Sequence, residues 1–141
     1  MGTATVQGDL WSGNPRDWAE FQEPLFAPMY RAVLDRAGVG AGARVLDVGC
    51  GSGLFCSFAA QRGAAVAGID AAEGLLAIAR ASATRCCWPP ESWPGRRFRR
   101  ASNASEVATS FALARRSCLP TFWIFSGYAT LSSTVMCGNS A

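Results

Sequence analysis

A short apolar strand that runs directly into a glycine-rich turn constrains the fold of this chain more than any other feature. Residues 44–48 read Arg-Val-Leu-Asp-Val, which is typical of a buried strand, and residues 49–53 read Gly-Cys-Gly-Ser-Gly. Residues 54–62 then have the spacing of a helix, with Leu54 and Phe58 on one face. Glycines at such a junction let the backbone come close to a ligand, so the turn is a candidate binding loop.

A second strand and a second helix follow at residues 65–69 and 73–83. Strand, helix, strand and helix at this spacing indicate a βαβ unit with parallel strands. Upstream, the sequence predicts one helix that begins at Asn14-Pro15 and ends at Pro24, and another over residues 26–37. The predicted fold class is α/β, with a Rossmann-like doubly wound parallel sheet that is incomplete after the second strand–helix unit.

Two acids make the glycine-rich turn more specific. Asp47 precedes it on the first strand, and Asp70 ends the second strand 17 residues beyond Gly53. That spacing is close to the roughly 20-residue offset of an acid that binds ribose hydroxyls. The dinucleotide fingerprint would place a glycine where Leu54 stands, and the P-loop requires a lysine, which this chain lacks. The remaining pattern is Asp-x-Gly-x-Gly-x-Gly.

The segments VLDVGCGSG and VAGID resemble the first two motifs of class I S-adenosyl-L-methionine (SAM) dependent methyltransferases, most of all small bacterial enzymes with a ubiquinone-biosynthesis-like core. The resemblance implies that SAM is the cofactor and that its methyl group passes to a small-molecule acceptor. It implies that the glycine loop follows the methionine and ribose portions, that Asp47 helps to fix the amino-acid end, that Asp70 binds the ribose hydroxyls and that Ala71 lies against adenine. The implied cofactor-binding residues are Asp47, Gly49, Cys50, Gly51, Ser52, Gly53, Asp70 and Ala71.

The resemblance is strong over residues 43–80 and stops at about Thr84. Residues 1–84 carry six Arg against eight acids, whereas residues 85–141 carry seven Arg against two acids and contain no Asp. We expect residues 1–84 to be N-terminal helices and the SAM-binding βαβ half of a methyltransferase domain. We expect residues 85–141 to be an unrelated or frameshifted tail with no assignable domain, and a truncated domain of this kind could be inactive.

The chain has no His, and none of its six Cys forms a CxxC pair. We therefore expect no metal site, and reduced thiols in a cytoplasmic protein without a secretory signal. Methyl transfer depends mainly on positioning the acceptor, so the absence of His does not exclude this reaction. The sequence assigns no catalytic residue and no oligomeric state.

Two other functions stay open. A non-catalytic nucleotide- or SAM-binding fragment would bind without turnover. A tail-anchored membrane protein would use residues 119–136, which are uncharged, but Pro120 and Gly127 make them a poor span, and we expect β structure or no settled fold there.

Three aromatic residues and one basic run have alternative interpretations. We expect Trp11, Trp18 and Phe21 to pack the N-terminal helices on the sheet rather than to line a substrate pocket. We expect Arg96–Arg100 to be a solvated charged loop rather than a nucleic-acid site. Neither a nucleic-acid nor a membrane partner is expected.

Overall fold

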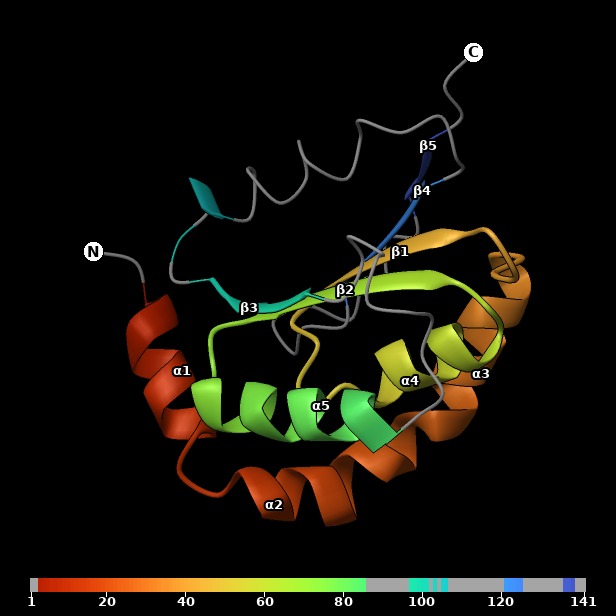
Figure 1. The fold of residues 1–141 in the computed structure, drawn as a ribbon. Coiled ribbons are helices and arrows are strands. Elements are labelled where there is room, and N and C mark those ends of the chain that lie inside the picture. The colour runs from red at the N-terminus through yellow and green to blue at the C-terminus, as the bar shows by residue number, and fades with distance from the viewer. Residues whose placement is uncertain are drawn as a thin grey trace.

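The computed structural model describes residues 3–85, 97–101, 103, 105–106, 121–125 and 136–138. After a helical N-terminal part, strands and helices alternate from β1 through α5 to β3 (Figure 1). The elements, in chain order, are α1 (Ala4–Trp11), α2 (Pro15–Asp17), η1 (Trp18–Gln22), η2 (Glu23–Phe26), α3 (Ala27–Arg36), β1 (Arg44–Val48), α4 (Leu54–Gln61), β2 (Ala65–Asp70), α5 (Glu73–Arg85), β3 (Arg97–Arg100), β4 (Thr121–Phe125) and β5 (Met136–Gly138).

The five strands form one sheet in the order β3-β2-β1-β4-β5. Strands β1 to β4 pair in parallel, and β5 pairs with β4 in the antiparallel direction. Val45 of β1 lies opposite Val66 of β2 on one side and opposite Phe122 of β4 on the other. The predicted Rossmann-like parallel sheet is therefore confirmed, and the strand order is that of a doubly wound α/β fold.

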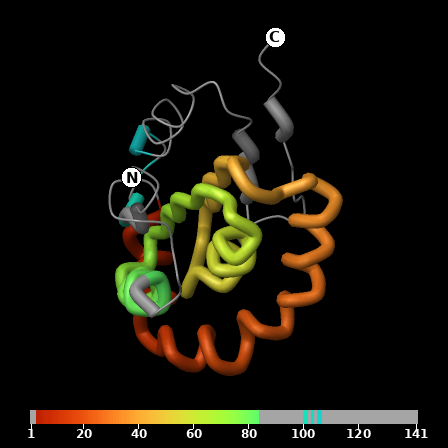
Figure 2. Tube along the Cα trace, turned by 45° about the vertical axis from the view of Figure 1, so that its right-hand side comes forward, coloured from red at the N-terminus to blue at the C-terminus, as the bar shows by residue number. Residues whose placement is uncertain are grey.

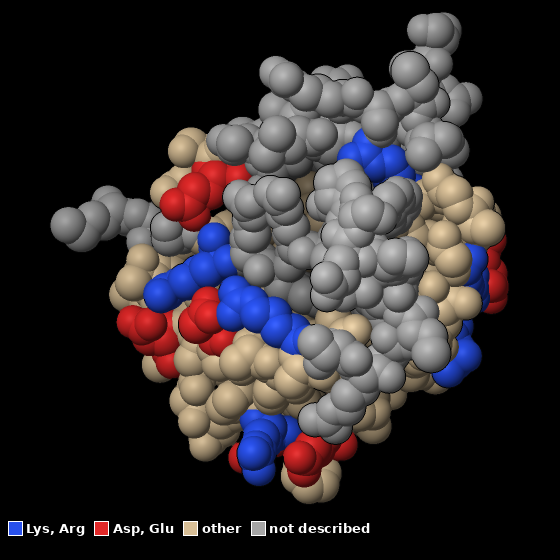
Figure 3. Space-filling model, in the orientation of Figure 1, with Lys and Arg blue, Asp and Glu red and all other residues tan. Residues whose placement is uncertain are grey.

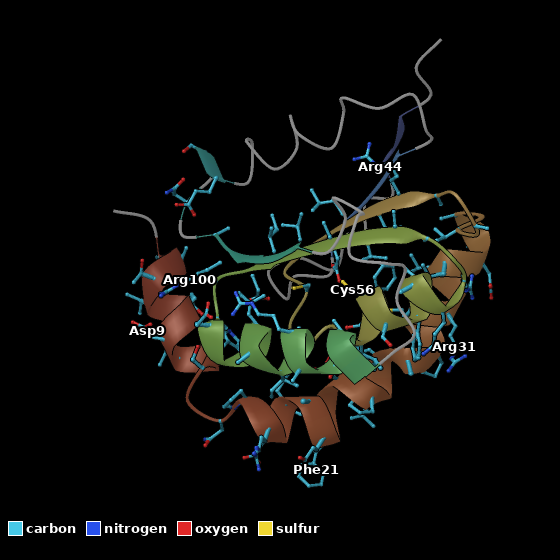
Figure 4. All side chains as sticks on the ribbon, viewed as in Figure 1. Asp9, Phe21, Arg31, Arg44, Cys56 and Arg100 are labelled. Carbon is cyan, nitrogen blue, oxygen red and sulfur yellow. The ribbon has the colours of Figure 1, made fainter. Side chains whose placement is uncertain are left out.

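The expectation of a charged loop at Arg96–Arg100 is wrong for residues 97–100, which form β3 and pair with β2. This short strand stands at the end of the strand order and is held by backbone pairing with β2 rather than by a hydrophobic pattern of its own. Arg100 lies 3.6 Å from the Asp9 carboxylate of α1, and the two side chains lie near one another in Figure 4. Described Arg and acidic side chains are interspersed on the face shown in Figure 3.

The helices gather on one side of the sheet, and α4 and α5 contact the strands directly (Figure 1). The N-terminal helices pass along their outer side, since α1 and α2 contact α5, and α3 contacts α4 (Figure 2). Leu34, Phe55 and Leu76, from α3, α4 and α5, are each no more than 1% exposed and pack with strand residues such as Val45 and Val66. Full burial of such side chains contributes roughly 1.5–3 kcal/mol each.

The N-terminal part differs from expectation in two ways. Residues 4–11 form α1, which the sequence did not predict, and the helical stretch from Pro15 does not end at Pro24. Instead it passes through a π-helical turn at 18–22 and a 3-10 turn at 23–26 before α3 begins. Pro24 stands at the start of the 3-10 turn, where its missing N–H does least harm.

No helix in the described part of the chain is long and apolar enough to cross a membrane. Of the uncharged stretch at 119–136, the structure describes residues 121–125 and 136, which lie in β4 and β5. The rest of the stretch, on which the tail-anchor alternative depends, lies outside the described residues.

Candidate cofactor-binding site

The loop between β1 and α4 contains three glycines whose backbone conformation is left-handed. Gly49, Gly51 and Gly53 have φ values of 81°, 55° and 86°, which L side chains rarely adopt. The N–H groups of Gly49 and Cys50 both donate to the carbonyl of Ile69 in β2, over 2.7 and 3.1 Å. The loop is thereby tied to the carboxyl end of the neighbouring strand, which is where ligands bind in open α/β sheets.

Asp70, at the end of β2, reaches across to this loop. Its Oδ2 accepts a hydrogen bond of 2.9 Å from the N–H of Gly51, and its Oδ1 accepts one of 2.8 Å from the N–H of Ala72. Each carboxylate oxygen has a second acceptor position, so Asp70 can still accept bonds from a ligand. The next residue, Ala71, packs against Gly8 of α1, where a Cβ would meet the carbonyl oxygen of Ala71 at 2.4 Å.

Asp47 lies in the middle of the protein rather than on the surface of the site. It is 0% exposed, and the thiol of Cys56 donates to its Oδ2 over 3.4 Å. The pKa of Cys56 is raised well above its ordinary value by the hydrogen bond with Cys50, by burial and by Asp47. The hydrogen bond with Cys56 lowers the pKa of Cys50, but burial and the nearby acids together raise it by more, so the net shift is upward. Both thiols are therefore protonated at neutral pH and are poor nucleophiles.

Glu23 belongs to the same site, although the sequence analysis did not select it. Its side chain is 2% exposed, and the hydroxyl of Ser52 donates to its Oε2. Burial raises the pKa of Glu23 from 4.5 to about 7; the hydrogen bonds from Ser52 and the Leu54 N–H lower it, and Asp47 and Asp70 raise it. No local pattern marks this residue, because its partners are about thirty positions away in the sequence.

The aromatic residues of the N-terminal helices form a connected row that ends in the core. Trp11 and Trp18 meet edge to face with ring centroids 5.2 Å apart, and Trp18 stacks on Phe26 at 6.1 Å. The row continues through Tyr30 to Phe55 of α4, with a last separation of 5.4 Å. Trp18 therefore helps to pack the N-terminal helices, whereas Trp11 is 37% exposed and joins this row through Trp18, so its packing on the sheet stays a prediction.

The third aromatic residue does not follow this expectation. The Phe21 side chain is 68% exposed and points away from the protein, so it neither packs on the sheet nor lines a pocket (Figure 4). The reason is the π-helical turn, in which Phe21 falls on the outer side of the helical stretch while Trp18 faces inward.

The structure thus brings the sequence-predicted residues together at the carboxyl ends of β1 and β2. The five residues 47 and 50–53 are buried, while Gly49, Asp70 and Ala71 are half-buried. Among the residues that the structure describes, no group of three or more His, Cys, Asp or Glu side chains is placed to hold a metal ion.

Comparisons with known proteins point to one family. Residues 45–113 match the family described as a methyltransferase domain. Over 46 residues the chain is 56% identical to a ubiquinone biosynthesis O-methyltransferase of Pseudomonas aeruginosa (strain LESB58) and 59% identical to that of Pseudomonas paraeruginosa (strain DSM 24068 / PA7). The corresponding protein of Acinetobacter baumannii (strain ACICU) is 56% identical over 46 residues.

These matches cover 33% of this chain and 19% of each relative, so the chain spans about a fifth of the length of the curated relatives it matches. The family match runs on to residue 113, while the domain boundary expected near Thr84 stays a prediction. The matched segment contains the strand, the glycine loop and the second strand whose geometry is described above. Residues 45–113 therefore resemble the methyltransferase domain family, and these matches support a domain of the class I SAM-dependent type in this part of the chain.

Proposed function

We propose that this chain binds SAM at the loop between β1 and α4, and that the domain to which it belongs transfers the SAM methyl group to a small-molecule acceptor. The observation that carries the proposal is the placement of Asp70, whose carboxylate is held at the glycine loop by the N–H groups of Gly51 and Ala72. The proposed cofactor-binding residues are Asp47, Gly49, Cys50, Gly51, Ser52, Gly53, Asp70 and Ala71.

The residues fit such a ligand in shape. Positions 49, 51 and 53 carry no side chain, so the loop backbone can lie directly against a bound molecule. Asp70 can accept hydrogen bonds from two adjacent hydroxyl groups of a ribose, because each of its oxygens keeps an acceptor position. Ala71 follows it with a small apolar side chain that suits the face of a base.

The residues also fit in charge. Asp47, Asp70 and Glu23 surround the loop, and SAM carries positive charge on its sulfonium and its ammonium groups. When bound, SAM supplies an electrophilic methyl group on the sulfonium. The protein's contribution is to orient the cofactor and the acceptor, since this reaction depends mainly on positioning.

The names of the relatives describe O-methyl transfer, which supports methyl transfer as the class of reaction. A non-catalytic nucleotide- or SAM-binding fragment is the second candidate, and it would bind the cofactor without turnover. For either function we propose a cytoplasmic location, because Cys50 and Cys56 are free thiols in contact range rather than a disulfide.

Isothermal titration of the full chain with S-adenosylhomocysteine, the demethylated cofactor, tests the proposal. The Asp70→Ala variant should bind about ten- to a hundredfold more weakly, because a charge-assisted hydrogen bond is lost. Asp35→Ala is the matched control, since Asp35 is an exposed surface acid paired with Arg62. Unchanged affinity in Asp70→Ala would refute the ribose assignment, and no binding by the unmodified chain would refute the proposed function.

A further inference from the structure

Glu23 is the one acid of the N-terminal helices that lies inside the protein against the glycine loop. Its Oε2 accepts the Ser52 hydroxyl, and its Oε1 would lie 3.2 Å from a Cβ on Gly51. A side chain at position 51 would crowd this carboxyl. Glu23 therefore lies where the proposed cofactor passes along the loop.

The charges around Glu23 are all of one sign. Asp47 and Asp70 face it from the ends of β1 and β2, and their charges disfavour its ionisation. The other titratable groups that face it are the Tyr30 hydroxyl from α3 and the Cys50 thiol from the loop, and both have their pKa raised in part by Glu23. None of these groups is cationic. The described Arg ion pairs are those of Arg62, Arg80 and Arg100 with other acids.

A buried carboxyl without a cationic partner is expensive to ionise, and a ligand that brings the missing positive charge removes that cost. We propose that Glu23 is a cofactor-binding residue that accepts a hydrogen bond from the ammonium group at the amino-acid end of SAM. This inference rests on the proposed function, and it adds to the site a residue from outside the two family motifs. Glu23 acts here as a carboxylate acceptor, with Ser52 and Leu54 holding its side chain in place.

Binding of an ammonium group to Glu23 should change the number of protons that the protein holds. In the free protein Glu23 has a pKa of about 7, so it is mostly protonated at pH 6. An ammonium group bound to it favours the carboxylate, and binding should then release close to one proton at pH 6. The ligand's own amino group, with a pKa of roughly 7.7 or higher, is already charged at that pH and contributes little.

The experiment is titration calorimetry of the full chain with S-adenosylhomocysteine at pH 6, in two buffers with different ionisation enthalpies. The difference in heat between the buffers gives the number of protons released. We expect close to one proton per ligand, and binding up to about fivefold tighter at pH 7 than at pH 6. Methylthioadenosine, which has the nucleoside but no amino-acid end, should bind without proton release.

Glu23→Gln should abolish the proton release and weaken S-adenosylhomocysteine about ten- to a hundredfold at pH 7, with methylthioadenosine unaffected. Glu20→Gln, the same change at an exposed acid three positions earlier, should behave as the unmodified chain. Binding of both ligands without proton release would overturn this inference alone. If neither ligand binds the unmodified chain, the proposed function fails together with the inference.

Discussion

The backbone N–H of Gly51 donates a 2.9 Å hydrogen bond to Oδ2 of Asp70, which joins the loop after β1 to the end of β2. This bond relates the two sequence motifs in space, since one residue comes from the glycine-rich turn and the other from the second strand. It also orients the Asp70 carboxylate before any ligand arrives. Pre-organisation of this kind lowers the entropic cost of binding.

The conformation of Gly51 predicts a penalty for any side chain at that position. Gly51→Ala should destabilise the protein by about 1–2 kcal/mol, because its φ of 55° disfavours an L residue and a Cβ would meet Trp18 Nε1 at 3.1 Å. Gly40→Ala is the control, since a Cβ there meets nothing within 4 Å. Urea unfolding measures both, and equal midpoints for the two variants would contradict the loop conformation.

The packing of α3 predicts a difference between two leucines nine positions apart. Leu34 is 0% exposed and Leu25 is 77% exposed. Leu34→Ala should lower the free energy of unfolding by about 2–5 kcal/mol, because it opens a cavity between α3, α4 and the sheet. Leu25→Ala should change it by no more than about 0.5 kcal/mol. A small effect of Leu34→Ala in chemical denaturation would mean that the N-terminal helices do not pack as described.

Glu23 predicts a specific pH dependence of stability in the free protein. Its pKa is about 7 when folded and 4.5 ordinarily, so between these values the folded state holds a proton that the unfolded state has lost. The contribution of Glu23 to the unfolding free energy is therefore greatest below pH 4.5, and it falls by roughly 3 kcal/mol as pH rises to 7. Glu23→Gln should remove this fall. Parallel pH profiles for the variant and the unmodified chain would contradict the burial of Glu23.

Strand β4 predicts that part of the tail is protected from solvent. Residues 121–125 pair in parallel with β1, so their amides should exchange slowly, at rates comparable with those of β2. Hydrogen exchange followed by mass spectrometry of peptides from both strands gives the comparison. Such protection would argue against the unrelated or frameshifted tail, whereas fast exchange at 121–125 would support a domain boundary near Thr84.

The sequence alone determined the elements whose signals are local. The bounds of β1, β2, α3 and α4 differ from prediction by one or two residues at most, because each has its own hydrophobic period and all but β2 end close to a glycine. The positions of the glycine loop and Asp70 followed in the same way, since their spacing along the chain sets which strand ends they occupy.

Only the tertiary structure decided which residues lie around the glycine loop and Asp70. Glu23 reaches Ser52 across 29 positions, and β1 pairs with residues 121–125, more than 70 positions later. Contacts of that separation leave no periodic trace in the sequence. The basic residues at 97–100 were misinterpreted for the same reason, because a short end strand is stabilised by hydrogen bonds to β2 rather than by its own pattern. The burial of Glu23 depends on how the helices pack on the sheet. Its raised pKa follows mainly from this burial and could therefore not be predicted from the sequence.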